Sequence, residues 1–123
     1  MTIKELYARI DGNYDQAIRV MKMEKLIDRY IRKLSASTFV EALSAAADSL
    51  DPTALFENAH AMKGVCANLG LDKLAAAANV ITEEFRPGNS RTLSDDEVRA
   101  KVRDIEAAYR HTVEQIRQYA ENT

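Results

Sequence analysis

The hydrophobic residues of this sequence recur every three or four positions along almost the whole chain, as they do in helices with one buried face. The pattern predicts helices over residues 3–10, 14–34, 39–50, 52–69, 72–85 and 94–119. No stretch shows the strict apolar and polar alternation of a half-buried strand. The sequence therefore predicts an all-α protein.

The breaks between these helices hold residues that cap or end helices. They are Asp11-Gly12-Asn13, Ser35 or Ser37 as a cap, Asp51 before Pro52, Gly70, the loop Arg86-Pro87-Gly88-Asn89-Ser90, and a capping box from Ser94 to Glu97. Short connections place consecutive helices antiparallel. We expect an up-down bundle of four principal helices with one or two accessory N-terminal helices, in one domain spanning residues 1–123.

The same spacing predicts which side chains face the core of the bundle. On the early helices these are Val20, Met23, Ile27, Tyr30 and Leu34, followed by Phe39, Leu43, Ala46 and Leu50. On the later helices they are Leu74, Ala78, Ile81 and Phe85, then Val98, Val102, Ile105, Tyr109, Thr112, Ile116 and Tyr119.

The helix over 52–69 carries a histidine on its polar side. At about 100° per residue, the apolar residues fill an arc from roughly 140° to 260° away from His60. That apolar set is Leu55, Ala59, Met62, Val65, Cys66 and Leu69. Within about 60° of His60 lie Phe56, Lys63, Gly64 and Ala67. His60 is therefore expected at the surface, with a cation one turn away.

Gly64 makes this surface unusual. A glycine inside a helix costs roughly 1 kcal/mol relative to alanine, and nothing near Gly64 predicts a helix end. A missing side chain beside His60 favours close approach by another molecule, which a merely solvated face would not need.

Composition limits the possible functions. The chain has 123 residues, of which 46% are hydrophobic and 29% charged, with a formal net charge of −2. The charges are mixed, whereas nucleic-acid and membrane surfaces need clustered positive charge. The single Cys66 excludes an internal disulfide. Neither a signal peptide nor a membrane span is visible. We expect a cytoplasmic monomer that binds neither nucleic acid nor membrane, and Met1 favours an independent chain.

The run His60-Ala61-Met62-Lys63-Gly64, followed by Ala67-Asn68-Leu69-Gly70, resembles the histidine-containing phosphotransfer (HPt) domain. That family's pattern is His, two residues, Lys or Arg, then Gly. The resemblance extends over most of the chain, including 51–56 and 71–74. Sensor-kinase dimerisation helices also carry a phosphorylated histidine, but an acidic residue and a proline typically follow it. Here Ala61 follows, and the next proline is Pro87.

The resemblance implies a phosphocarrier in a His-Asp phosphorelay rather than an enzyme, without a cofactor of its own. His60 would take a phosphoryl group from the aspartate of a receiver domain and pass it to a second receiver, with a hybrid sensor kinase as a further partner. Lys63 would stabilise the phosphoryl charge, and Gly64 would admit the receiver. Phe56 and Ala67 would form the docking surface around the histidine.

Two asparagines also match positions in the family pattern. Asn79, with Glu83 one turn later as a substitute, would orient the imidazole of His60. Asn68 matches as well, but a structural role at the helix end explains it equally well.

Other chemistries fit the sequence less well. Glu57 and His60 form one E-x-x-H motif, whereas a di-iron bundle needs two, and two histidines with one cysteine are too few for zinc. No glycine-rich nucleotide cradle is present. Cys66 lies on the apolar arc, away from His60, and His111 has no suggestive neighbours. The main alternative function is a helical-bundle adaptor that binds a protein partner and is never phosphorylated.

Overall fold

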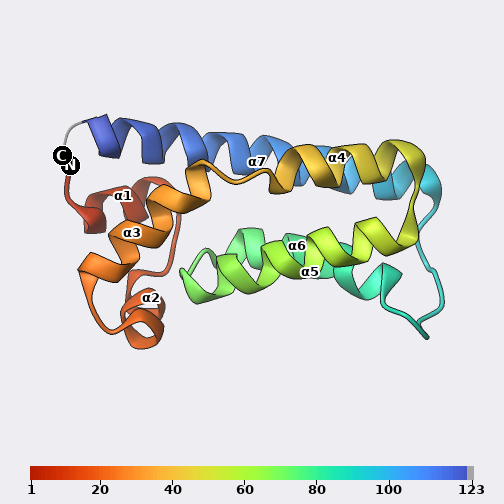
Figure 1. Ribbon diagram of the computed structural model, residues 1–123, viewed down its shortest axis with the longest axis horizontal. Helices are drawn as coiled ribbons and strands as arrows, with labels where there is room; N and C mark the ends of the chain where they lie inside the picture. The colour runs from red at the N-terminus through yellow and green to blue at the C-terminus, as the bar shows by residue number, and fades with distance from the viewer. Residues whose placement is uncertain (122–123) are drawn as a thin grey trace.

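The computed structural model describes residues 1–121 and has no strand in that range. Its helices are α1 (Ile3–Arg9), α2 (Tyr14–Met21), α3 (Glu24–Ser35), α4 (Phe39–Ser49), α5 (Pro52–Asn68), α6 (Asp72–Phe85) and α7 (Asp95–Glu121) (Figure 1). The predicted all-α fold is confirmed. No helix within these residues is both long enough and apolar enough to cross a membrane.

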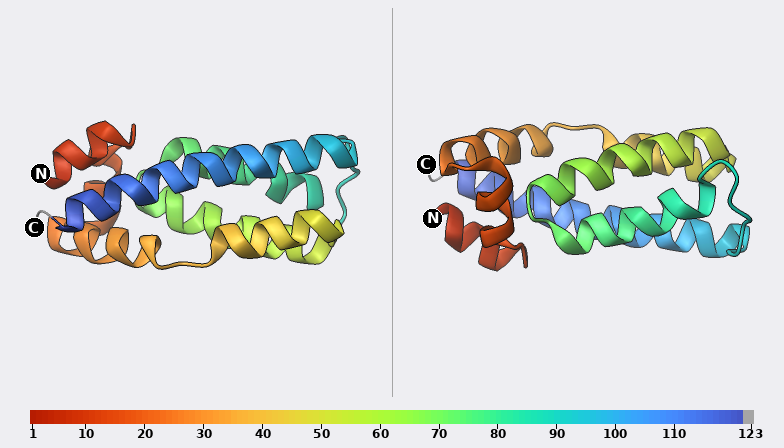
Figure 2. Two further views of the ribbon diagram at one scale, coloured as in Figure 1. Left: turned by 90° about the horizontal axis from the view of Figure 1, so that it is seen from above. Right: turned by 90° about the horizontal axis from the view of Figure 1, so that it is seen from below.

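Helices α4, α5, α6 and α7 form the bundle. Each packs on two of the others, in the pairs α4 with α5, α5 with α6, α6 with α7 and α4 with α7. Helix α3 continues the line of α4 along the C-terminal part of α7 (Figure 2). Helix α1 lies against that same part of α7, and α2 packs between α3 and α5. The up-down bundle with accessory N-terminal helices is confirmed.

The predicted helix over 14–34 is wrong, because the chain breaks inside it. Lys22 has a left-handed backbone with φ of +75°, and Met23 is extended with φ of −149°. Helix α2 therefore ends before Lys22, and α3 starts after Met23 at an angle to it. Left-handed backbone is normally supplied by glycine or asparagine, so a lysine there gives no signal in the sequence.

Three residues of this segment that were predicted in the core lie at the surface. Val20 and Tyr30 are each 41% exposed and Met23 is 51% exposed. Ile27 and Leu34 are buried, as predicted. The early helices therefore carry less of the core and more apolar surface than their spacing indicates.

Two of the predicted helix starts are confirmed. Asp51 Oδ1 accepts a hydrogen bond from the Ala54 N–H at 3.2 Å. Ser94 Oγ accepts from the Glu97 N–H at 3.1 Å, while Glu97 Oε1 accepts from the Ser94 N–H at 3.0 Å. These two starts set the registers of α5 and α7.

Helix α4 starts at Phe39 as predicted, but neither serine that was predicted to cap it does so. Thr38 holds the N-cap position and makes no capping hydrogen bond with its side chain. The hydroxyl of Ser35 donates to the Arg32 carbonyl at 2.7 Å, and that of Ser37 contacts the Tyr109 hydroxyl. Both serines are therefore engaged elsewhere.

The buried side chains form one hydrophobic cluster. The predicted inward residues of α6 and α7 are all buried, as are Leu43 and Ala46 on α4. Phe39 and Leu50 are only half-buried, because they lie at the two ends of α4. The bundle core thus follows the sequence pattern most closely along α6 and α7.

The turn between α5 and α6 is fixed by the N-terminal helices. Gly70 has φ of +69°, and a Cβ atom there would lie 2.2 Å from the Asn13 carbonyl oxygen. The Asn13 N–H donates to the Gly70 carbonyl at 2.7 Å, and the Tyr7 hydroxyl donates to the Leu69 carbonyl at 2.6 Å. Only glycine permits this approach, which anchors the C-terminal end of α5.

Candidate functional site

His60 lies near the middle of α5 with its side chain exposed. The opposite face of α5 carries Leu55, Ala59, Met62 and Cys66, each 0% exposed. Because these residues are packed into the bundle, the rotation of α5 is fixed and the imidazole must face outward. Ala67 is exposed on the same helix, and Phe56 and Lys63 are half-buried.

Gly64 leaves open space beside His60. Apart from its chain neighbours and the nearby backbone of α5, a Cβ atom built on Gly64 would meet no heavy atom of residues 1–121 within 4 Å. The glycine therefore serves no internal packing, in contrast to Gly70 at the end of the same helix. An approaching molecule can reach the α5 backbone at this point.

Phe56 and His60 are stacked. They are one turn apart on α5, their ring centroids are 5.4 Å apart, and the ring planes differ by 14°. Arg86, the residue that follows α6, places its guanidinium 5.3 Å from the centroid of the Phe56 ring. Helical spacing in the sequence predicts that Phe56 lies next to His60. It predicts neither the stacking of the two rings nor the contact between Phe56 and Arg86.

The ammonium of Lys63 is available to a phosphoryl group on His60, because the nearby charges of Arg86 and Glu83 pair with each other. Arg86 donates to the Glu83 carboxylate at 2.9 to 3.2 Å. These hydrogen bonds lower the pKa of the Glu83 carboxyl, and the charge of Lys63 lowers it further. Within residues 1–121, Lys63 itself forms neither an ion pair nor a hydrogen bond. A phosphoryl group on His60 would therefore not have to displace an existing partner of Lys63.

No hydrogen bond joins Asn79 to His60 among the described residues. Its side-chain oxygen is buried and has no hydrogen-bond partner in the described structure. The residue lines a hollow formed by α6 and the loop after it. No hydrogen bond reaches the imidazole of His60 from any described residue, and its one ring contact is Phe56. An orienting role for Asn79 stays a prediction.

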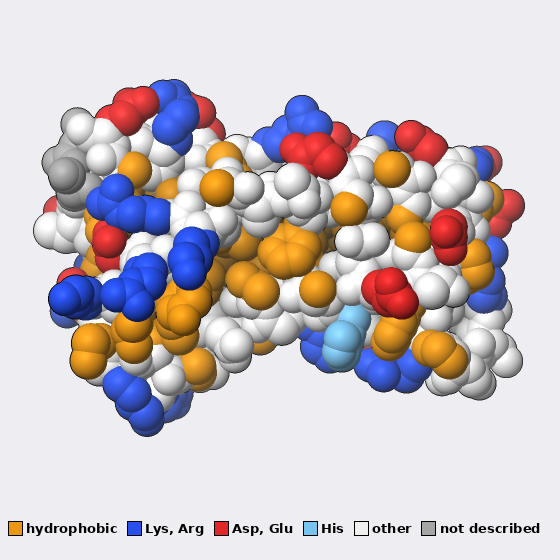
Figure 3. Space-filling model, viewed as in Figure 1, with side chains coloured by type: hydrophobic (Ala, Val, Ile, Leu, Met, Phe, Trp, Pro, Cys, Tyr) orange, Lys and Arg blue, Asp and Glu red, His pale blue; other side chains and the backbone are white. Residues whose placement is uncertain are grey.

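Beyond His60, α5 borders an apolar groove. Val65 was expected in the core but is 36% exposed, because α2 and α3 cover this side of α5 only in part. The groove holds about 420 Å³ between α2, α3 and α5, and its lining is Val20, Met21, Leu26, Tyr30, Val65, Asn68 and Leu69. Lysine and arginine side chains cluster beside exposed apolar atoms on this face (Figure 3). Two of the predicted core residues that proved exposed, Val20 and Tyr30, thus line this groove with Val65.

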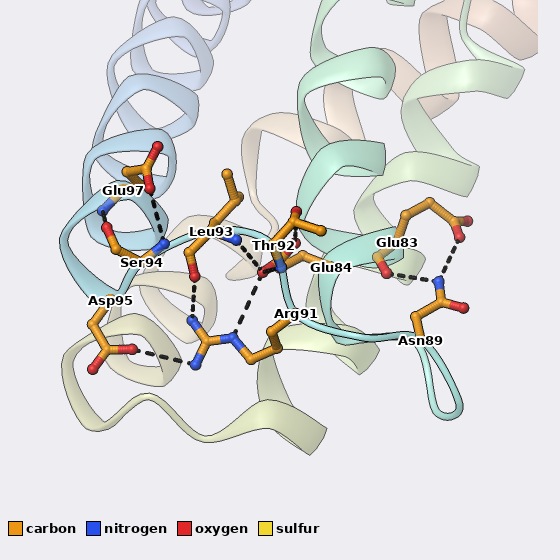
Figure 4. Close-up of polar contacts among 9 residues, drawn as sticks. All are labelled: Glu83, Glu84, Asn89, Arg91, Thr92, Leu93, Ser94, Asp95 and Glu97. Carbon is orange, nitrogen blue, oxygen red and sulfur yellow. Dashed lines mark hydrogen bonds and ion pairs between the residues drawn. The ribbon is translucent and has the colours of Figure 1, made fainter.

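The loop that connects Arg86 to α7 is held in place by the buried carboxylate of Glu84. Glu84 accepts hydrogen bonds from the N–H groups of Thr92 and Leu93 at 2.8 and 2.7 Å, and from the Thr92 hydroxyl at 2.9 Å (Figure 4). Burial alone would raise the pKa of Glu84, but these hydrogen bonds and the nearby Arg91 bring it below its usual range. The loop is thereby fixed against α6.

The remaining candidates from the sequence do not join this site. Cys66 is buried on the opposite face of α5, and burial raises the pKa of its thiol to about 12. His111 is exposed on α7, which packs against α4 and α6. Residues 1–121 contain no cluster of side chains that could hold a metal ion.

Comparison with known families gives one match, the Hpt domain, over residues 24–119. The match includes α3 to α6 and most of α7, and thus the whole surface around His60. No curated protein and no solved structure matches the chain. Domains of this family transfer phosphoryl groups through a histidine in phosphorelays and interact with receiver domains. With most of its length matched, the chain belongs to the family of histidine-containing phosphotransfer domains.

Proposed function

We propose that His60 accepts a phosphoryl group from the aspartate of one receiver domain and passes it to the aspartate of another. The observation that carries this proposal is the surface of α5, where an exposed histidine lies beside open space at Gly64 and one turn from Lys63, which forms no ion pair or hydrogen bond with a described residue. A family member needs one accessible histidine, and His60 lies inside the matched segment. We also propose that residues 1–123 act as one domain, since the buried residues form one cluster.

The chemistry needs little from this chain. The outer ring nitrogen of neutral His60 attacks the phosphorus of the aspartyl phosphate, forming a P–N bond while the P–O bond to the aspartate breaks. The aspartate leaves as a carboxylate, and the proton on the inner ring nitrogen remains in place. Transfer to the second receiver reverses these steps. The receiver would supply magnesium and most of the catalytic groups, which makes this domain a carrier.

The test is transfer of labelled phosphate. A receiver domain phosphorylated with a radiolabel is mixed with the purified chain, and the label on the chain is followed over time. We expect label that is lost in acid and kept in base, as in phosphohistidine, and none from ATP alone. If active receivers from several phosphorelays leave the chain unlabelled while one still binds it, the unphosphorylated adaptor is the better description.

Lys63→Ala should slow transfer or shorten the lifetime of phosphorylated His60. The ammonium can pair with phosphoryl oxygens one turn from the imidazole, and a charge-assisted contact of this kind stabilises the product. Stability should change by less than about 0.5 kcal/mol, because Lys63 forms no ion pair with any of the residues that the structure describes. Single-turnover transfer and the decay of the label are measured on both proteins. Unchanged rates and lifetime would leave Lys63 as a solvated charge.

We further propose that the receiver docks over His60 and the adjoining groove between α2, α3 and α5. Val20→Asp should raise the receiver concentration needed for half-maximal transfer about tenfold, which corresponds to roughly 1.4 kcal/mol of lost binding. The matched control is Val80→Asp. Val80 is 43% exposed against 41% for Val20, and it lies in a different groove, lined by α6, α7 and the end of α1. Equal effects of the two substitutions would contradict docking at the α2–α3–α5 groove.

A further inference from the structure

The exposed imidazole of His60 is held by an aromatic ring rather than by a hydrogen bond. Among the described residues its one contact of this kind is the stack on Phe56, at 5.4 Å and 14°. Transfer of a phosphoryl group requires the attacking nitrogen to lie in line with the bond that breaks. An exposed side chain that can rotate freely would spend little time in that orientation. Whatever restricts the ring of His60 therefore bears on the rate of transfer.

Phe56 is in turn held from a different helix. The guanidinium of Arg86 lies 5.3 Å from the Phe56 ring centroid, within the range of a cation–π contact. Arg86 is 30 residues further along the chain and directly follows α6. It therefore restrains Phe56 from outside α5.

Arg86 is also restrained. Its guanidinium donates to both carboxylate oxygens of Glu83 at 2.9 to 3.2 Å. Asn89 donates its side-chain amide to the Glu83 carbonyl at 2.9 Å, so the start of the loop is tied to the end of α6 (Figure 4). The buried Glu84 holds the next part of that loop. A continuous set of contacts thus leads from a fixed loop through Arg86 and Phe56 to the imidazole.

We infer that Phe56 and Arg86 are positioning residues for His60, with Arg86 fixing the Phe56 ring and Phe56 fixing the imidazole. This role is distinct from docking, because it acts on the orientation of the nucleophile and not on affinity for the receiver. Its consequence for transfer rests on the proposed function, whereas its consequence for ring geometry does not.

The first measurement needs no phosphorylation. In Phe56→Leu, which keeps an apolar side chain but removes the aromatic face, the ring-proton NMR signals of His60 should lose the ring-current shift caused by the stack. Phe56→Tyr should keep that shift, and Arg86→Gln should reduce it. His111, which has no aromatic neighbour among the described residues, is the internal reference. If the His60 signals do not move in Phe56→Leu, or do not move in Arg86→Gln, the inference is overturned.

The second measurement is single-turnover transfer as a function of receiver concentration. We expect Phe56→Leu to lower the saturating rate on the order of tenfold and Arg86→Gln about threefold, with the half-saturating concentration nearly unchanged. Phe56→Tyr should restore the rate. Lys4→Gln is the matched control, because Lys4 lies 5.2 Å from the Tyr14 ring and its loss removes the same charge and kind of contact. It should leave the rate unchanged.

The two measurements distinguish failure of the positioning role from failure of the proposed function. A higher half-saturating concentration with an unchanged saturating rate would make Arg86 and Phe56 docking contacts and overturn the positioning role. If the unsubstituted chain takes no label from any receiver, the proposed function fails, while the NMR signals still decide whether the two residues fix the imidazole.

Discussion

His60→Gln is expected to abolish labelling of this protein by a phosphorylated receiver. Glutamine is similar in size and polar, but its amide nitrogen is not a nucleophile, so the P–N bond cannot form. The fold should not change, because the His60 side chain is exposed and glutamine suits a helix slightly better than histidine. Label on the chain and thermal unfolding are measured on the same preparation. A loss of label with an unchanged melting temperature identifies the acceptor.

The matched control is His111→Gln. His111 is the other histidine of the chain, is also exposed, and lies on α7. This variant should be labelled as fast as the unsubstituted protein. Undiminished labelling of His60→Gln, or a loss of label in His111→Gln, would contradict the assignment of His60.

Gly64→Gln should keep or raise stability and yet slow transfer by more than tenfold, an effect of at least about 1.4 kcal/mol on the barrier. Replacing an interior helical glycine by alanine gains roughly 0.5 to 1 kcal/mol when the new side chain meets nothing, and glutamine follows alanine closely in helix propensity. Beyond the nearby backbone of α5 and its chain neighbours, a Cβ at Gly64 meets no described atom within 4 Å. The new side chain would, however, occupy the space through which we propose that a receiver reaches His60. Gly64→Ala should be intermediate in transfer.

Denaturant unfolding and single-turnover transfer on both variants decide this prediction. Ala107→Gln is the control, since it places the same side chain on an exposed position of α7, away from α5. Its transfer rate should be normal. Unfolding of Gly64→Gln would mean that the glycine serves internal packing, and normal transfer in a stable Gly64→Gln would remove the role of Gly64 in admitting the receiver.

Much of the fold could be predicted because its information is local. The spacing along α6 and α7, the Asp51 cap and the Ser94–Glu97 capping box each lie within a few residues of sequence. The break at Lys22 could not be predicted, because the left-handed residue is a lysine and the apolar spacing continues through it. The outward turn of Val65 also depends on tertiary structure, since its exposure is set by how far α2 and α3 extend over α5.

The surface around His60 was predicted for a similar reason. His60, Lys63 and Gly64 are on one helix, so their common face follows from helical geometry, and the cost of an interior glycine marks the place. For Arg86, the sequence predicts only a place in a loop. Its contact with Phe56 joins two helices, and no spacing within a single sequence encodes such a pairing. The burial of the Asn79 side-chain oxygen, which has no hydrogen-bond partner among the described residues, also depends on how the helices pack and could not be predicted from sequence spacing.

The contacts at Gly70 have a consequence for dissecting this protein. The family match begins at residue 24, whereas Tyr7 and Asn13, which donate to the carbonyls of Leu69 and Gly70, precede it. Producing the matched segment alone would remove both hydrogen-bond donors from the α5–α6 turn. It would also expose the apolar side chains that α1 and α2 cover. We therefore expect a protein that begins at residue 24 to be less stable than the full chain. Its local unfolding should start at the α5–α6 turn and extend along α5 toward His60.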